Sequence, residues 1–181
     1  MKIEILNEAG FNEAIYGLSL SYNTTLTRAY ERSLLLYNKN EGHNKFLEHI
    51  DIWMKVTAPR FWWSEADTIR LSTKQSESTM HTIQNGHLTQ SDFEYDIPLE
   101  YLRHLNSLID QVRNHSIDID ILKNDLPEGF LQTREWKISY NILRNIIVQR
   151  RNHKLPQWRS FCDFMLKNIE HEEYMKDLIG E

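Results

Sequence analysis

The chain has 181 residues, of which 40% are hydrophobic and 26% are charged. This length and apolar content are enough for one compact core, so we expect a single domain over residues 1–181. The formal net charge of −5 disfavours a surface that binds bulk nucleic acid, although a local cluster of arginines can still hold one nucleotide.

Cys162 is the only cysteine, which excludes an intramolecular disulfide and a cysteine-based zinc site. The histidines show no recognised zinc spacing either. The first residues, Met-Lys-Ile-Glu-Ile, are typical of a strand and not of a signal sequence, and no apolar stretch is long enough to cross a bilayer. We therefore expect a cytoplasmic protein, in the host cytoplasm if the gene is viral, with no membrane partner and no metal.

The N-terminal part is predicted to contain two short strands and a helix. Apolar and polar residues alternate at residues 1–5 and again at residues 17–22, which is the period of a half-buried strand. Over residues 24–37 the apolar residues recur at helical spacing, with Thr24 or Thr25 able to cap the start.

A further strand and a helix follow in direct succession. Residues 50–57 alternate between apolar and polar side chains and predict a half-buried strand. Pro59 suits the first position of a helix, which should run through Trp62 and Trp63. Two adjacent tryptophans on a helix are typical of one core residue and one interface residue, although either ring could stack on a flat aromatic ligand.

The second half is predicted to be mainly helical. The segment 72–92 is rich in Ser, Thr, Gln and Asn and should be the longest loop, followed by a short strand at 93–96. Helices are expected from Pro98, over 136–151 and over 156–169, with an inert Cys162 on the apolar face of the last one. Strands and helices without βαβ regularity predict an α+β domain with an antiparallel sheet.

Common catalytic motifs are missing from the chain. It has no Gly-x-Ser-x-Gly elbow, no P-loop and no Gly-x-Gly-x-x-Gly, so a hydrolase or a kinase has no support. The missing nucleophile is compatible with a cofactor-dependent enzyme, because there the cofactor carries the reaction and the protein supplies orientation and electrostatics.

The segment from Glu48 to Met80 resembles the flavin-dependent thymidylate synthases, which methylate dUMP with FAD. In that family a Glu-His pair opens a strand, Ala-Pro follows, and a helix leads to an Arg-His-Arg-x-x-Ser-x-Asn-Glu-x-Ser-x-Arg signature. This chain has Glu48-His49 and then Ala58-Pro59 at the same spacing. Its signature positions read Thr68-Ile69-Arg70-Leu71-Ser72-Thr73-Lys74-Gln75-Ser76-Glu77-Ser78-Thr79-Met80, of which Arg70 and Ser78 are identical to the signature.

A second block extends the resemblance to roughly residues 43–165. The family's last helices carry Asn-x-Arg-x-Leu, then an arginine, then a histidine followed six residues later by an arginine. With one residue deleted before the histidine, the matching positions are Leu143, Arg150, His153 and Arg159. Short, divergent members from phages and prophages share the Ala-Pro-x-x-Trp-Trp string, so the chain resembles that type.

The resemblance implies a homotetramer with an antiparallel sheet flanked by helices and FAD in the subunit interface. It also implies a pyrimidine deoxynucleotide, dUMP or a relative, stacked on the flavin, with NADPH and methylenetetrahydrofolate as co-substrates. Aromatic residues at 136, 158, 161 and 164 predict surface for such an assembly.

The resemblance also assigns roles to individual residues. It implies flavin contacts for His49, Arg70 and His153, nucleotide contacts for Glu65, Gln75, Ser78, Arg150 and Arg159, and catalytic roles for Ser78 and Arg159. Arg159 is the leading candidate, because a guanidinium presents a planar fork to a phosphate or a carbonyl.

Each of these residues also has a structural explanation. His49 could be a helix-terminal or core histidine, Arg70 could pair with Glu65 or Asp67, and the basic segment 150–159 could be a solvated helix face. Charged or imidazole groups of the signature are replaced here by Thr68, Ile69, Ser76 and Met80, and Lys74 is a candidate substitute cation.

Three functions therefore remain open. The first is a flavin-dependent thymidylate synthase. The second is a FAD enzyme that acts on another pyrimidine nucleotide or transfers another one-carbon group. The third is a non-catalytic nucleotide-binding oligomer that serves as a sensor, a sequestering protein or an inhibitor.

Overall fold

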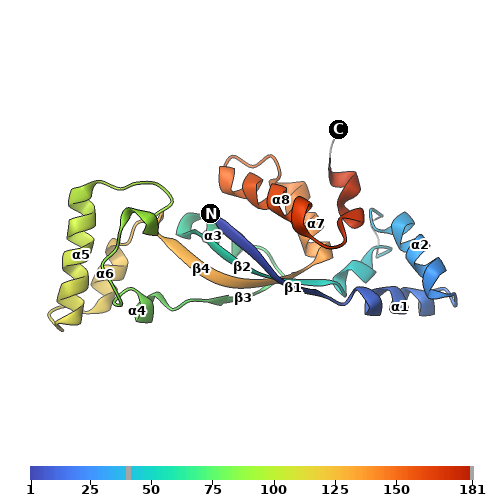
Figure 1. Cartoon of the computed structure of the whole chain (residues 1–181), viewed down its shortest axis with the longest axis horizontal. Helices are drawn as coiled ribbons and strands as arrows, with labels where there is room; N and C mark the ends of the chain where they lie inside the picture. Colours follow the sequence, from blue (N-terminus) through green and yellow to red (C-terminus); the bar gives the residue numbers. More distant parts are fainter. Residues whose placement is uncertain (40–41, 180–181) are drawn as a thin grey trace. The chain divides into compact units, whose positions relative to one another are not determined.

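The computed structural model describes residues 1–39 and 42–179. Within these ranges four strands form one antiparallel sheet in the order β1-β2-β4-β3, flanked by helices (Figure 1). The strands are β1 (Lys2–Ala9), β2 (Asp51–Pro59), β3 (Thr73–Ser76) and β4 (Leu131–Ser139). The predicted α+β class with an antiparallel sheet is confirmed.

The chain divides into two compact units. One contains Met1–Lys2, Val56–Ile69 and Gln75–Arg134, and the other contains Ile3–Lys55, Arg70–Lys74 and Glu135–Glu181. The predicted single domain over 1–181 stays a prediction, because compact units of one chain can still fold cooperatively. No described helix is long and apolar enough to cross a membrane.

The first unit has a small core between two helices. α5 (Leu99–Arg113) and α6 (Ile119–Asp125) lie side by side in Figure 1. Side chains from both helices, together with Phe93 and Phe130, make one buried cluster. The α5 members recur at helical spacing and are Leu105, Leu108, Ile109 and Val112.

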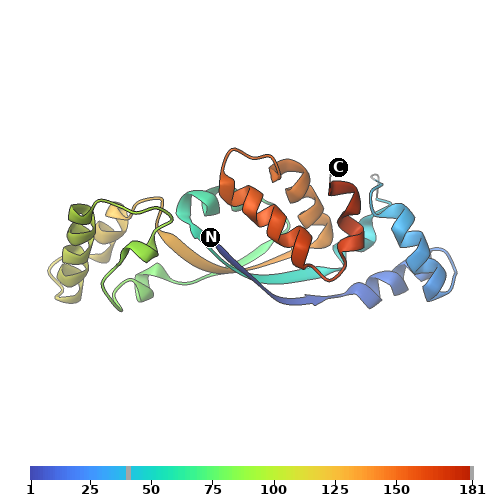
Figure 2. The ribbon, with the colours of Figure 1, turned by 45° about the horizontal axis from the view of Figure 1, so that its top comes forward.

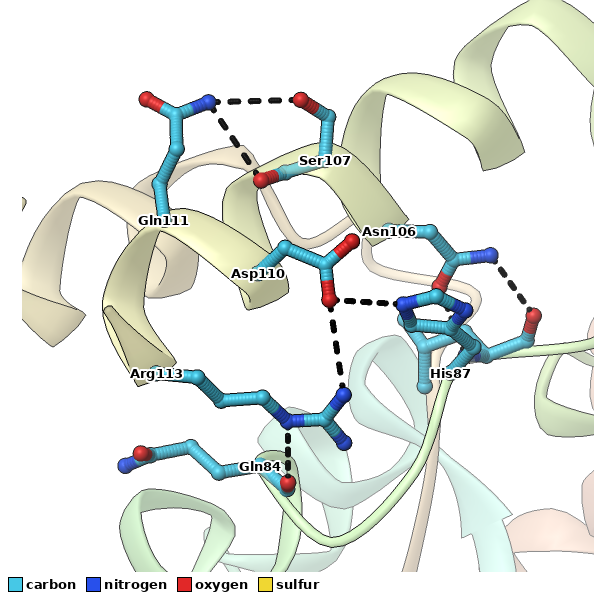
Figure 3. A network of polar contacts seen from close by, with 8 residues as sticks. Gln84, His87, Asn106, Ser107, Asp110, Gln111 and Arg113 are labelled. Atoms are coloured by element: carbon cyan, nitrogen blue, oxygen red, sulfur yellow. Dashed lines mark hydrogen bonds and ion pairs between the residues drawn. The ribbon is translucent and has the colours of Figure 1, made fainter. Parts of the chain in front are cut away.

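Polar contacts hold the loop after α4 (Thr79–Thr82) against α5 (Figure 3). The Asn106 side chain accepts a hydrogen bond from the Leu88 N–H at 2.7 Å and donates one to the Leu88 carbonyl at 3.0 Å. Asp110 Oδ1 lies 2.9 Å from His87 Nε2, and this hydrogen bond is the main cause that lowers the pKa of Asp110. The loop therefore has a defined position on the helix.

α3 (Arg60–Ala66) begins directly after β2, with Pro59 as its N-cap and not, as predicted, its first residue. Trp62 and Trp63 are both fully buried, with ring centroids 4.9 Å apart, and Trp63 Nε1 donates to the Gln132 carbonyl at 3.1 Å. The prediction of one core and one interface tryptophan is therefore wrong. Neither ring is exposed for stacking on a flavin or a base.

In the second unit α7 (Tyr140–Arg150) and α8 (Pro156–Asn168) pack against each other (Figure 2). The Trp136 ring of β4 lies 5.5 Å from the Phe161 ring of α8, centroid to centroid, and both side chains are fully buried. Cys162 is also buried, and burial raises the pKa of its thiol to about 12. The expected apolar setting of this cysteine is confirmed.

The C-terminal segment η3 (Glu172–Leu178) is fastened to α7 by a buried arginine. Arg144 Nη1 and Nη2 donate to the two carboxylate oxygens of Asp177 at 2.8 and 2.7 Å. The Arg144 guanidinium carbon also lies 5.1 Å from the Tyr37 ring centroid. This fork-to-fork pair gives the segment a specific position as well as energy.

The strand predicted at residues 17–22 is wrong, because α1 (Phe11–Ser21) occupies this segment. The buried residues of α1 follow a helical spacing, with Ala14, Ile15, Leu18 and Ser19 on one face. The predicted helix that follows is confirmed as α2 (Leu26–Leu36), and its N-cap Thr25 accepts from the Arg28 N–H at 3.4 Å.

Two more elements differ from the predictions, one in its boundary and one in its existence. The helix expected over 136–151 begins only at Tyr140, because β4 continues to Ser139, whose hydroxyl caps the helix by accepting from the Ile142 N–H at 3.3 Å. The strand expected at 93–96 is also wrong, since in that segment only Phe93 makes a bridge, to Phe130.

The segment 72–92 is not one loop, as was expected. It contains β3, the short helix α4 and the 3-10 turn η2 (Gln90–Asp92). α6 was not predicted from the sequence either. It has seven residues, of which only Leu122 is fully buried. Such a short helix shows too few periods for its pattern to be recognised.

Gly10 joins β1 to α1 in a conformation that favours glycine, with φ of 95°. A Cβ at this position would lie 1.9 Å from the backbone oxygen of His49. Gly17, within α1, has no atom within 4 Å of its Cβ position. The two glycines therefore differ in both backbone strain and space.

A half-buried carboxylate, Glu8, connects β1 with the segment before η3. Glu8 Oε1 accepts from the Glu170 N–H at 2.9 Å, and Glu8 Oε2 accepts from the Tyr140 hydroxyl. That hydroxyl also accepts from the His171 N–H at 3.1 Å, and Phe11 stacks on the His171 ring with centroids 3.8 Å apart. Burial is the largest cause of the raised pKa of Glu8.

We expect Gly10→Ala to lower the free energy of unfolding by about 2–4 kcal/mol, because the strained φ and the clash with backbone add together. Gly17→Ala is the matched control and should raise it by about 0.5–1 kcal/mol, since alanine favours an open helical position. Urea denaturation measures both. Equal effects of the two substitutions would contradict the close approach at Gly10.

The raised pKa of Glu8 predicts a pH dependence of stability. The folded protein keeps the Glu8 proton to a higher pH than the unfolded chain does, so stability from this group falls as the pH rises from 4.5 through the raised folded pKa. Glu8→Gln keeps an acceptor for Tyr140 and should remove this loss. The free energy of unfolding, measured by denaturation at several pH values, should change less with pH for Glu8→Gln than for Glu4→Gln. Glu4 is an exposed control on the same strand. Identical pH profiles for the two variants would refute the raised pKa.

Candidate functional site

The predicted basic cluster lies where α7 leads into α8 (Figure 2). Arg150 Nη1 lies 2.9 Å from His153 Nε2, and the Arg150 guanidinium carbon lies 5.1 Å from the Trp158 ring centroid. The Leu155 N–H donates to His153 Nδ1 at 3.2 Å. A neutral imidazole accepts at one nitrogen only, so just one of the two contacts is a full hydrogen bond at a time. Both contacts fix the ring beside the guanidinium.

Arg159 belongs to the same cluster and is exposed. Its Nη1 donates to the His153 carbonyl at 2.6 Å and to the Lys154 carbonyl at 3.2 Å. Arg151 is also exposed and donates to the Leu178 carbonyl. The structure therefore brings together Arg150, His153 and Arg159, and Arg159 holds the backbone of the turn that carries the histidine.

His49 is the C-terminal cap of η1 (Lys45–Glu48) and is exposed, which agrees with a helix-terminal histidine and not with a core one. It lines a cavity of about 460 Å³ together with His43 and Lys45, and the aromatic side chains of Tyr22 and Phe46 contribute to the same wall. Ligand pockets usually fall in this range of volume. The neighbouring Glu48 accepts from Asn141 Nδ2 at 3.2 Å.

Arg70 is exposed and is followed by Leu71, which has a φ of 57° and is 87% exposed. Among the described residues Arg70 makes no ion pair, and Asp67, one of its two expected partners, pairs with Arg134 at 3.0 Å. Lys74 Nζ donates to Ser72 Oγ at 3.1 Å. A non-glycine residue with positive φ is costly, and such strain is found preferentially at functional sites.

The remaining predicted residues lie in the first unit on different elements. Glu65 is half-buried on α3, Gln75 is exposed on the edge strand β3, and Ser78 is the exposed N-cap of α4. The Ser78 side chain makes no capping bond, so its hydroxyl is not used to hold the helix. The predicted site residues are therefore divided between the two units, and direct contacts join Arg150, His153 and Arg159.

Sequence reasoning missed a cationic pocket in the first unit. It has a volume of about 290 Å³, and its charged lining residues are Arg60, Lys123, Glu128 and Arg134. These residues are distant in sequence and belong to no motif, so only the fold brings them together. Across the described part of the chain, no group of three or more His, Cys, Asp or Glu side chains is arranged to hold a metal ion.

No protein-family model and no curated protein sequence matches this chain. Among solved structures it is similar to Thymidylate Synthase X from Helicobacter pylori with FAD and dUMP, with a TM-score of 0.82, 14% identity and 100% of both chains covered. It is also similar to a flavin-dependent thymidylate synthase from Helicobacter pylori complexed with FAD and dUMP, with a TM-score of 0.81 and 15% identity over 99% of this chain and 100% of that one. The chain therefore has the fold of a flavin-dependent thymidylate synthase over its whole length.

Proposed function

We propose that this protein is a flavin-dependent enzyme that transfers a one-carbon group to a pyrimidine deoxynucleotide, with dUMP as the first candidate. The main support is the fold, which matches structures solved with FAD and dUMP along the whole chain at TM-scores of 0.82 and 0.81. The residues shared with the family signature, Arg70 and Ser78, point in the same direction.

FAD fits the chemistry of the cavity beside His49. The imidazoles of His43 and His49 and the Lys45 ammonium can bind a diphosphate. The rings of Tyr22 and Phe46 can pack against an aromatic group. We assign flavin contacts to His49, Arg70 and His153. Bound flavin supplies hydride transfer, with NADPH as reductant and methylenetetrahydrofolate as the one-carbon donor in this proposal.

The nucleotide contacts are assigned to the residues that the family resemblance named. Arg150 and Arg159 offer guanidinium forks for a phosphate or a uracil carbonyl, and Glu65, Gln75 and Ser78 offer acceptors and donors for the base and sugar. As catalytic groups we assign Arg159, which would polarise the uracil ring, and Ser78, whose hydroxyl is not used as a helix cap. The hydrogen bonds of Arg159 to two backbone carbonyls would reduce the entropy cost of bringing its guanidinium into the reactive geometry.

A homotetramer is part of the same proposal, although not for the reason that the sequence suggested. Of the four aromatic residues that were expected to supply surface, Trp136, Trp158 and Phe161 are fully buried within the chain and Phe164 is half-buried. Several exposed apolar residues lie instead on α1 and α2, namely Tyr16, Leu20, Leu26, Tyr30 and Leu35. Exposed apolar residues in this number are typical of an interface.

A second candidate function is a non-catalytic nucleotide-binding oligomer on the same scaffold. One observation favours it, namely that four signature positions are replaced by Thr68, Ile69, Ser76 and Met80. Each lost charged contact would cost about 1.5–3 kcal/mol of binding energy. A FAD enzyme with a different pyrimidine nucleotide, such as one from a phage with altered DNA bases working in the host cytoplasm, would also tolerate these replacements.

The test uses the purified full-length chain. We expect a yellow protein with flavin absorbance at about 450 nm, a mass of about four chains by light scattering, and dTMP formed from dUMP when NADPH and methylenetetrahydrofolate are added. Flavin binding without product from dUMP or another pyrimidine nucleotide would favour the non-catalytic candidate. A colourless monomer that binds no nucleotide would refute both.

Arg159→Ala should weaken dUMP binding more than Arg151→Ala. A desolvated charged contact to the nucleotide costs about 2–5 kcal/mol when it is truncated, whereas an exposed arginine costs about 0–1 kcal/mol. Arg151 is a matched control, because it is exposed and also donates to a backbone carbonyl. Calorimetric titration with dUMP and dTMP decides the matter, and equal affinities in the two variants would remove Arg159 as the nucleotide clamp.

A further inference from the structure

We propose that the cationic pocket of the first unit binds a phosphate monoester, and that Glu128 is a resident counter-ion which the phosphate displaces. The pocket has a volume of about 290 Å³ and is formed by α3, α4, α6 and the start of β4. The assignment of this phosphate to a nucleotide rests on the proposed function. The chemistry of the pocket itself does not.

Arg60 is held in place while its charge stays accessible. Its backbone N–H donates to the Phe130 carbonyl at 3.1 Å, and its Nη1 donates to the Leu126 carbonyl at 2.9 Å. Its Nη2 lies 3.3 Å from Glu128 Oε1 in an ion pair whose side chains are 32% and 59% exposed. An ion pair this exposed is only weakly stabilising, so a doubly charged ligand can replace the carboxylate.

Arg134 supplies a second, immobile charge. Its Nη1 donates to both carboxylate oxygens of Asp67 at 3.0 and 3.1 Å, and its Nη2 donates to Gln132 Oε1 at 3.1 Å. The guanidinium carbon lies 4.5 Å from the Trp63 ring centroid. The buried Nε of Arg134 has no hydrogen-bond partner among residues 1–39 and 42–179. A preorganised cation loses little conformational freedom when a ligand arrives.

Lys123 and Thr79 complete the set of donors. Lys123 is exposed on α6 and forms no ion pair with any residue that the structure describes, so its charge is not compensated locally. Thr79 is buried, and its hydroxyl accepts from Gln132 Nε2 at 2.9 Å, which leaves its own O–H for a ligand. Two guanidinium groups, an ammonium and a hydroxyl match the several oxygens of a phosphate.

The charges balance when phosphate replaces Glu128. The three cations of the pocket face two carboxylates, Glu128 in the lining and Asp67 behind Arg134. A phosphate monoester carries about −1.5 to −2 at neutral pH. With the Glu128 side chain displaced into water, Asp67 and the phosphate together neutralise the three cations. This local excess of positive charge is unusual in a chain with a net charge of −5.

The experiment compares three full-length variants with the wild type in calorimetric titrations against dUMP, deoxyuridine and inorganic phosphate. Lys123→Ala should weaken dUMP and phosphate binding by about three- to ten-fold, whereas Lys167→Ala, an exposed lysine on α8, should leave both unchanged. Glu128→Gln should tighten both by about two- to five-fold, since it removes the competing carboxylate. If Glu128 only stabilised the fold, Glu128→Gln would not raise the affinity for phosphate. Tighter binding by this variant therefore distinguishes a role in ligand binding from a role in folding.

The proposal is overturned if Lys123→Ala and Lys167→Ala bind phosphate equally and Glu128→Gln gives no gain, or if dUMP and deoxyuridine bind with the same affinity. Flavin absorbance and product formation are measured on the same samples. Phosphate binding that depends on Lys123 and Glu128 in a colourless, inactive protein would support the pocket and contradict the proposed function. A yellow, active protein whose phosphate binding does not depend on Lys123 and Glu128 would support the proposed function and contradict the pocket.

Discussion

The one-sided burial of β2 is the constraint on which the rest of the structure depends. Four alternate residues of this strand, Ile52, Met54, Val56 and Ala58, are fully buried, and the strand pairs with both β1 and β4. A slip of one residue would turn all four side chains to the other face, so the register is fixed. The register also fixes where the chain enters the strand, just after His49, and where it leaves the strand, at the start of α3.

The arginines of both candidate sites are bound to the protein before any ligand arrives. Arg60 and Arg159 donate to backbone carbonyls, and Arg134 is clamped by Asp67 and stacked on Trp63. A long cationic side chain loses much freedom when it binds an anion, and such contacts remove part of that loss in advance. Arg70 differs, since it lies in an exposed segment next to a strained Leu71.

Local sequence patterns predicted the elements whose apolar residues repeat several times or whose ends carry a clear cap. They failed where the same apolar residues fit both the strand repeat and the helix repeat. β2, α2 and α8 were predicted because their buried residues repeat several times and Thr25 or Pro156 marks the start. Leu18, Leu20 and Tyr22 alternate as a strand would, but burial of Ala14, Ile15 and Leu18 decides for a helix. The cluster at 150–159 is local and was found, whereas the pocket of Arg60, Lys123 and Arg134 depends on contacts distant in sequence.

The strand order has a consequence for how the chain folds during synthesis. β3 has a single neighbour, β4, which comes much later in the sequence, and β2 also awaits β4 on one side. Until β4 has left the ribosome, one edge of β2 and the pairing edge of β3 remain without a partner. Pairing between distant segments is slow, because loop closure must precede the contacts that reward it. The strand order therefore leaves aggregation-prone edges exposed for longer during synthesis than a series of hairpins would.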